Sequence, residues 1–209
     1  MLVIALCKGR LLDPSLDLLK RAGVQFKDDL TSSRKLIFES TDGKFSAILV
    51  KPVDVPTYVE YGAVDIGIGS RDLLMESGAD VLQPLDLHFG YVKIAVAGPK
   101  GAHSINGSDQ ATVRVATKFP RITMDHFNSR GIPVEIIPLS GSIELAPLIG
   151  LADRIVDLVE TGRTLKENGL EILEVIAEST ARLLINRASY QTKREEILTV
   201  IQALEKARQ

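Results

Sequence analysis

Short runs of apolar residues alternate with amphipathic stretches along the whole chain. This pattern is typical of α/β proteins, in which strands and helices follow one another. Strands are predicted at Leu2–Leu6, Lys35–Glu39, Ser46–Val50, Val64–Ile68, Tyr91–Ala97, Arg114–Thr117, Val134–Pro138, Arg154–Val159 and Arg182–Asn186.

Capping residues and glycines set the expected limits of the helices. Helices are predicted over about 13–23, 54–60 and 119–130, and from Ser189 or Thr192 to the end of the chain. Asp13 and Pro14 have the order of an N-cap followed by a proline in the first helical position. Thr192 and Glu195 have the spacing of a capping box.

Two segments of the chain resemble each other weakly. Asp65–Leu73 and Asp157–Leu165 each contain a carboxylate, a strand, a turn of small residues and an Arg-x-Leu sequence. This repeat suggests two similar α/β units that form two lobes around one cleft.

The most informative segment follows the strand predicted at Arg154–Val159. The sequence Thr161-Gly-Arg-Thr164 places backbone N–H groups, two hydroxyls and a guanidinium after an apolar strand that carries Asp157. Such a turn can hold a phosphate, and a nearby carboxylate suits ribose hydroxyls, so the segment suggests a phosphorylated ribose. A simple strand-to-helix turn, with Gly162 at positive φ and a threonine cap, explains the same residues.

Composition narrows the class of protein. The chain of 209 residues is 45% apolar, has a net charge of −2 and contains one cysteine. Its charge gives no general attraction to nucleic acid or anionic lipid, so any anion site is local. One cysteine cannot form an internal disulfide, and no signal peptide or membrane span is evident. We therefore expect a soluble cytoplasmic protein.

Several motifs together resemble the ATP phosphoribosyltransferase family. The matching segments are Ala5–Leu11, Ser33–Phe38, Lys51–Gly62, Val115–Lys118, Glu144–Asp153, Thr161–Leu170 and Leu184–Ser189. The resemblance implies a two-lobed α/β fold of the periplasmic-binding-protein (type II) kind. Lobe I is expected at 1–91 plus 177–209, and lobe II, with the phosphate loop, at 92–176.

The resemblance also implies an activity and partners. In this family N1 of the ATP adenine displaces pyrophosphate from phosphoribosyl pyrophosphate (PRPP), the first step of histidine biosynthesis. Mg²⁺ is expected to arrive mainly with PRPP and ATP. The chain resembles the short form, which lacks a regulatory domain, so we expect a regulatory subunit similar to a histidyl-tRNA synthetase. A homodimer is expected for the chain alone, and a larger hetero-oligomer with that subunit.

Site residues are carried over from the matching motifs. Residues expected to bind PRPP are Glu144, Asp157, Thr161, Gly162, Arg163 and Thr164. Residues expected to bind ATP are Lys8, Gly9, Arg10, Arg34, Lys51, Arg71 and Asp72, with Arg10 and Arg34 as the catalytic cations that stabilise the departing pyrophosphate. Three departures from the family pattern are Cys7, where proline or a small residue is common, Lys51, where arginine is common, and Gly69-Ser70.

Other interpretations remain open for several of these residues. Glu144 also suits a helix N-terminus capped by Ser142, and the basic residues also suit a solvated surface. Cys7 and the three histidines, His88, His103 and His126, form no catalytic or metal-binding pattern and are expected to be structural or exposed. The alternative function is a two-lobed protein that binds one small anion without catalysis.

Overall fold

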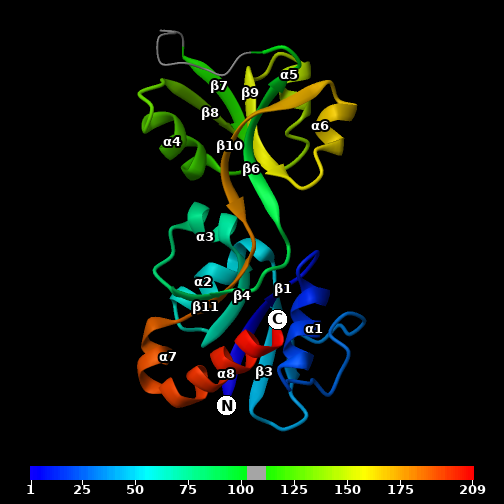
Figure 1. The fold of residues 1–209 in the computed structure, drawn as a ribbon, viewed down its shortest axis with the longest axis vertical. Helices are drawn as coiled ribbons and strands as arrows, with labels where there is room; N and C mark the ends of the chain where they lie inside the picture. The colour runs from blue at the N-terminus through cyan, green and yellow to red at the C-terminus, as the bar shows by residue number, and fades with distance from the viewer. Residues whose placement is uncertain (103–111) are drawn as a thin grey trace. The chain divides into compact units, whose positions relative to one another are not determined.

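The computed structural model describes residues 1–102 and 112–209, and it consists of two compact units (Figure 1). Unit 1 comprises Met1–Gly90 and Thr180–Gln209, and unit 2 comprises Tyr91–Ser179. The unit boundaries thus follow Gly90 and Ser179, whereas the predicted boundaries follow residues 91 and 176.

Unit 1 is built on a mixed six-stranded sheet of order β2-β3-β1-β4-β11-β5. Its strands are β1 (Leu2–Cys7), β2 (Ile37–Glu39), β3 (Phe45–Val50), β4 (Ile66–Ser70), β5 (Leu82–Asp86) and β11 (Ala181–Ile185). Its helices are α1 (Leu12–Arg21), the 3₁₀ helix η1 (Pro52–Asp54), α2 (Val55–Glu60), α3 (Arg71–Ser77), α7 (Arg187–Thr192) and α8 (Arg194–Ala207). Strands β3, β1 and β4 are parallel, so their carboxyl ends share one edge of the sheet.

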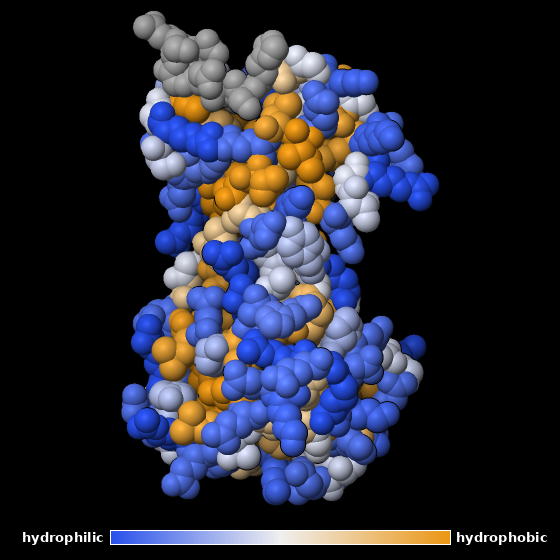
Figure 2. Space-filling view, viewed as in Figure 1, coloured by the Kyte–Doolittle hydropathy of each residue, from blue (hydrophilic) through white to orange (hydrophobic). Residues whose placement is uncertain are grey.

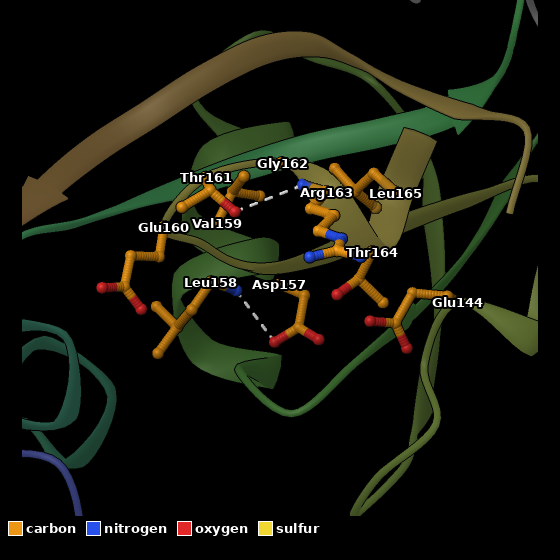
Figure 3. A pocket seen from close by; sticks show the side chains of 10 residues that line it. All are labelled: Glu144, Asp157, Leu158, Val159, Glu160, Thr161, Gly162, Arg163, Thr164 and Leu165. Atoms are coloured by element: carbon orange, nitrogen blue, oxygen red, sulfur yellow. Dashed lines mark hydrogen bonds between the residues drawn. The ribbon is translucent and has the colours of Figure 1, made fainter. Parts of the chain in front are cut away.

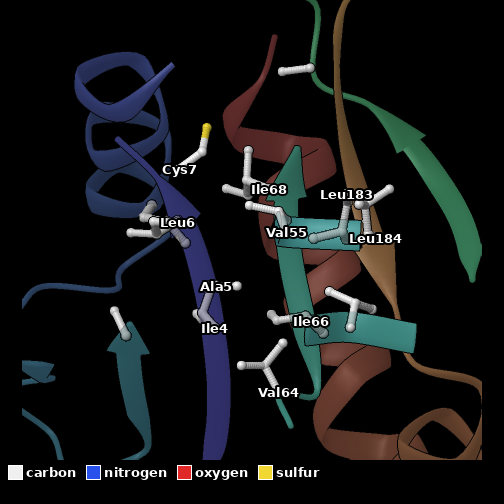
Figure 4. Close-up of a cluster of buried hydrophobic side chains, with 14 of the residues drawn as sticks. Ile4, Ala5, Leu6, Cys7, Val55, Val64, Ile66, Ile68, Leu183 and Leu184 are labelled. Atoms are coloured by element: carbon white, nitrogen blue, oxygen red, sulfur yellow. The ribbon is translucent and has the colours of Figure 1, made fainter. Parts of the chain in front are cut away.

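The core of unit 1 lies on the central strands. Ile4 and Leu6 of β1, Ile66 of β4 and Leu183 of β11 are almost completely buried (Figure 4). Consecutive residues of these strands are buried, because helices cover both faces of the sheet. This is why the strands appear in the sequence as continuous apolar runs.

Unit 2 is built on a five-stranded sheet of order β10-β6-β9-β7-β8. Its strands are β6 (Val92–Pro99), β7 (Val113–Thr117), β8 (Val134–Pro138), β9 (Arg154–Val159) and β10 (Leu170–Ser179). Its helices are α4 (Pro120–Asn128), α5 (Leu145–Leu148) and α6 (Arg163–Glu167).

The two units share one topology. In unit 1 the chain passes from β1 through β3 and β4 to β5, and β11 lies between the last two strands. In unit 2 it passes from β7 through β8 and β9 to β10, and β6 lies between the last two. Strand β1 thus corresponds to β7, and β4 to β9. The two segments of the weak sequence repeat, Asp65–Leu73 and Asp157–Leu165, contain β4 and the second half of β9, each followed by the start of the next helix.

The two carboxylates of that repeat are not equivalent in the structure. Asp65 lies just before β4, whereas Asp157 lies inside β9. Asp65 accepts hydrogen bonds from the backbone N–H of Val3 at 2.9 Å, the Ser189 hydroxyl at 2.7 Å and the Lys193 ammonium at 2.8 Å. It ties β4 to β1 and to the C-terminal helices, which is a structural role.

Two strands are missing from the sequence prediction. β5 contains Pro84, which weakens a strand pattern, and it is tolerated because β5 is an edge strand. β10 has Glu171, Glu174 and Glu178 at helix-like spacing. Two shifts in its register against β6 break the alternation of a regular strand.

Two predicted helix starts are wrong. α1 begins at Leu12, so Asp13 and Pro14 lie in its first turn, where a negative charge and a missing N–H are both tolerated. The C-terminal helix is divided in two, and Asn186 caps α7 by accepting from the N–H of Ser189 at 2.8 Å. The Thr192 hydroxyl donates back to the Ala188 carbonyl at 3.0 Å and does not form a capping box.

Apolar side chains reach the surface of unit 2 (Figure 2). Among the described residues of this unit, the large exposed ones are Tyr91, Met124, Leu145, Leu148, Ile149, Leu151, Ile172 and Val175. Across residues 1–102 and 112–209, no helix is long and apolar enough to cross a membrane.

Candidate active site

The turn between β9 and α6 has Gly162, and not a threonine, at the N-cap of α6. Gly162 has φ +74°, in the left-handed region that favours glycine. The hydroxyl of Thr161 accepts from the N–H of Arg163 at 3.4 Å. Because the first N–H groups of a helix have no acceptor within it, this turn presents donors at the start of α6.

A pocket of about 210 Å³ lies beside this turn (Figure 3). It is lined by Glu144, Asp157, Leu158, Val159, Glu160, Thr161, Gly162, Arg163, Thr164 and Leu165. All of these residues belong to unit 2, and they include all six that the motifs assign to PRPP. The structure therefore brings the segment before α5, the second half of β9 and the turn into α6 to one place.

Asp157 carries a largely buried charge in the pocket. Its side chain is only 14% exposed, and one carboxylate oxygen accepts from the N–H of Leu158 at 2.8 Å. Burial raises the pKa of Asp157, the Leu158 N–H and Lys118 act against this rise, and Glu144 adds to it. The carboxylate lines the pocket.

Glu144 and Arg163 lie at two sides of the pocket. Glu144 occupies the N-cap position of α5, and the Ser142 side chain does not cap this helix. Glu144 thus stands at a helix N-terminus and in the pocket wall at once. The guanidinium of Arg163 is largely exposed and donates to Glu167 at 2.7 Å.

The residues assigned to ATP gather at one edge of the sheet in unit 1. Lys8 follows β1, Lys51 follows β3 and Arg71 follows β4, so all three stand at the carboxyl ends of parallel strands. β2 is antiparallel to β3, with Ile37 opposite Ile48, so Arg34 precedes β2 at the same edge. The side chains of Lys8, Arg34 and Lys51 are exposed. Ligands of open α/β sheets bind at this kind of edge.

Other residues of this edge have structural contacts. Gly9 has φ +93°, which allows the turn after β1. Arg10 donates to the carbonyl of Gly90 at 2.9 Å, and a guanidinium retains further donors beyond this bond. Asp72 is buried in the first turn of α3.

The cysteine and histidines lie in different surroundings. Cys7 is buried at the end of β1, and the ring of His126 packs edge-on against Phe127 with centroids 5.2 Å apart. His88 is in a left-handed conformation at φ +61°, and His103 lies outside the described residues. Among the residues that the structure describes, no three His, Cys, Asp or Glu side chains form a group that could hold a metal ion.

Lys118 is a charged neighbour of the pocket that the site prediction omits. Its Nζ lies 3.8 Å from Oδ2 of Asp157. Lys118 directly follows β7, as Lys8 directly follows the equivalent strand β1. The match of Val115–Lys118 to the family was the only signal in the sequence that pointed to this residue.

Comparison with solved structures confirms the predicted fold class. The chain resembles the periplasmic aliphatic sulphonate binding protein of Escherichia coli at a TM-score of 0.61 and 14% identity, covering 99% of this chain and 72% of that one. At such low identity the likeness shows a periplasmic-binding-protein type of fold and nothing about function. It is therefore equally compatible with the alternative of a non-catalytic binding protein.

Closer relatives decide between the two functions. A protein named ATP phosphoribosyltransferase from Geobacter metallireducens is 50% identical over 206 residues, which cover 98% of this chain and 97% of the relative. The structure of an ATP phosphoribosyl transferase (HisG:HisZ) complex from Thermotoga maritima matches with a TM-score of 0.87 and 40% identity, covering 100% and 98% of the two chains. The profile of HisG, ATP phosphoribosyltransferase, matches residues 51–206. The chain therefore belongs to the ATP phosphoribosyltransferase family.

Proposed function

We propose that the pocket of unit 2 binds the 5′-phosphoribosyl group of PRPP and that the basic edge of unit 1 binds ATP and the departing pyrophosphate. As a member of its family, the chain is a pentosyltransferase that condenses ATP with PRPP in the first step of histidine biosynthesis. The observation that carries the proposal is the largely buried Asp157 carboxylate beside the Thr161–Thr164 turn in one pocket.

The chemistry of the transfer matches these groups. N1 of adenine has a free lone pair, so no general base is needed before the attack. The ribose C1 develops positive charge as its bond to pyrophosphate breaks, and a carboxylate near the ribose hydroxyls stabilises that charge. We assign this role to Asp157, with Glu144 as a second ribose contact. The turn at Thr161–Thr164 then anchors the 5′-phosphate through N–H groups and hydroxyls.

The leaving group requires cations. Pyrophosphate carries Mg²⁺ as part of the substrate, because Mg²⁺ binds phosphate oxygens and keeps much of its hydration shell. The described residues provide no cluster suited to a resident metal ion. Arg10 and Arg34, together with Lys8 and Lys51, supply the positive charge of the protein, and Arg71 and Asp72 are assigned to the nucleotide.

A second protein completes the proposed assembly. The Thermotoga maritima relative was solved as a HisG:HisZ complex. We propose that this chain likewise joins a regulatory subunit similar to a histidyl-tRNA synthetase, and that it forms a homodimer without it. We also propose that the enzyme works in the cytoplasm, where a lone cysteine such as Cys7 stays reduced.

An absorbance assay tests the activity. Purified protein is mixed with ATP, PRPP, Mg²⁺ and pyrophosphatase, and absorbance is followed where N1-substituted ATP differs from ATP. Pyrophosphatase removes the product that would reverse the reaction. A rise that requires both substrates is expected. No rise, with the chain alone and with the candidate regulatory subunit, would contradict the function.

Replacing Thr161 by valine tests the position of the 5′-phosphate. The change keeps the shape of the side chain but removes the hydroxyl that lines the pocket. Loss of one charge-assisted hydrogen bond is worth about 1.5–3 kcal/mol, so we expect kcat/KM for PRPP to fall about tenfold to a hundredfold. KM for ATP should change little. Thr199→Val, on α8 in unit 1, is the matched control, and unchanged kinetics in Thr161→Val would remove this residue from the site.

Replacing Arg34 by alanine separates catalysis from binding. Arg34 is exposed at the sheet edge, so the fold should survive. If its guanidinium stabilises the departing pyrophosphate, kcat should fall about tenfold to a hundredfold. This decrease in kcat should be larger than the increase in KM for ATP. Arg21→Ala, at the end of α1, serves as a control for loss of surface charge. An unchanged kcat with a raised KM for ATP would make Arg34 a binding residue only.

A further inference from the structure

Lys118 reaches the carboxylate of the pocket from a neighbouring strand. Its Nζ lies 3.8 Å from Oδ2 of Asp157, and its side chain is 41% exposed, against 14% for Asp157. The cation thus remains partly hydrated while the carboxylate is largely buried. A nearby cation lowers the free energy needed to ionise a largely buried carboxylate such as Asp157.

The backbone around Lys118 is fastened to the strand that carries Asp157. β7 is parallel to β9, with Thr117 opposite Val156. The buried Thr117 hydroxyl donates to the Val156 carbonyl at 2.7 Å and accepts from the N–H of Phe119 at 2.9 Å. The residues on both sides of Lys118 are therefore anchored, and its side chain starts from a defined point next to Asp157.

The other charged groups around the pocket do not replace Lys118. Glu144 raises the pKa of Asp157, and Glu160 adds a further negative charge to the pocket wall. Arg163 lies in the wall as well, but its guanidinium donates to Glu167. Among the side chains that the structure describes, Lys118 is the one that acts to lower the pKa of Asp157.

We propose that Lys118 is a positioning residue that keeps the Asp157 carboxylate ionised and directed into the pocket. The inference rests on the proposed function, in which ionised Asp157 stabilises the ribose during transfer. This role explains why a lysine directly follows β7. Lys8 has the same position after β1, the equivalent strand of unit 1.

The pH dependence of kcat/KM for PRPP tests this inference. Removing the cation in Lys118→Met should raise the pKa of Asp157 further, so the acid limb of the profile should move to higher pH. A shift of about one pH unit is expected, with about a tenfold loss on the acid side and a much smaller loss on the alkaline side. Lys118→Arg, which keeps the charge, should stay near the wild-type profile. Lys166→Met, which removes a charge from exposed α6 outside the pocket wall, should also do so.

A second readout does not depend on activity. Carboxyl ¹³C NMR of aspartate-labelled protein, with the Asp157 signal identified through Asp157→Asn, gives the pKa of this group directly. A higher pKa in Lys118→Met than in wild type and Lys166→Met supports the inference. An unchanged pKa, or a loss of activity that is equal at every pH, overturns it.

The proposed function and the role of Lys118 can be tested independently of each other. Wild-type kcat/KM in Asp157→Asn would remove Asp157 from the site, whatever Lys118 does. A large loss in Asp157→Asn, together with an unmoved acid limb in Lys118→Met, would leave the proposed function intact and refute the role of Lys118.

Discussion

Replacing Asp157 by asparagine is expected to lower kcat/KM for PRPP about a hundredfold. The change keeps the size of the side chain but removes the negative charge of the pocket, which the proposed function assigns to the developing cation on ribose. Hydrogen bonds to a charged group contribute about 1.5–3 kcal/mol, and the upper end of this range corresponds to two decades in rate. Most of the loss should fall on kcat, because the positive charge on ribose exists mainly in the transition state.

The same substitution should leave the protein at least as stable as the wild type. The pKa of Asp157 is raised by burial, which means that the folded state disfavours the ionised carboxylate. A carboxyl group whose pKa is raised in the folded state destabilises the fold once pH rises enough to ionise it. At neutral pH, a neutral asparagine therefore removes this cost in folding free energy. Steady-state kinetics and urea denaturation of Asp157→Asn measure the two effects. Asp125→Asn, exposed on α4, is the control; wild-type activity in Asp157→Asn would contradict the assignment.

Replacing Asp65 by alanine should destabilise the protein by about 2–3 kcal/mol without altering the pocket. Asp65 is 8% exposed and bonds to Lys193, Ser189 and the N–H of Val3. Breaking a buried ion pair costs about 3–5 kcal/mol, and the smaller value here allows for the partial exposure of Lys193. Urea denaturation measures the change. Asp28→Ala, which breaks an exposed pair with Lys35, should cost less than about 1 kcal/mol.

The stabilising effect of Asp65 should depend on pH in the acid range. Burial raises the pKa of this carboxyl, but the hydrogen bonds from Lys193, Val3 and Ser189 outweigh burial and lower it overall. The contribution is therefore complete above the unfolded pKa of about 3.9 and is lost as pH falls through the lower folded value. Wild type and Asp65→Ala should thus converge in stability in strong acid. A constant difference down to that range would contradict the ion-pair explanation.

The sequence by itself determined the features that depend on neighbours along the chain. Apolar runs marked the buried strands β1 and β4, because a strand covered on both faces is apolar along most of its length. The Thr161–Thr164 turn was recognisable because a glycine suited to positive φ and two hydroxyl residues directly follow an apolar strand, although these residues alone did not separate a phosphate site from a simple strand-to-helix turn. The motifs also grouped the six residues that the structure places around one pocket.

Only the tertiary structure decided which residues that are distant in the sequence lie close together in space. The sequence repeat paired Asp65 with Asp157, but Asp65 meets Lys193 and Ser189 from the end of the chain, whereas Asp157 faces a pocket. β10 escaped prediction because its pairing with β6, bulges included, outweighs the helix-like spacing of its glutamates. The approach of Lys118 to Asp157 depends on the alignment of β7 with β9. Such contacts join residues that are far apart in the sequence, and local propensity carries no information about them.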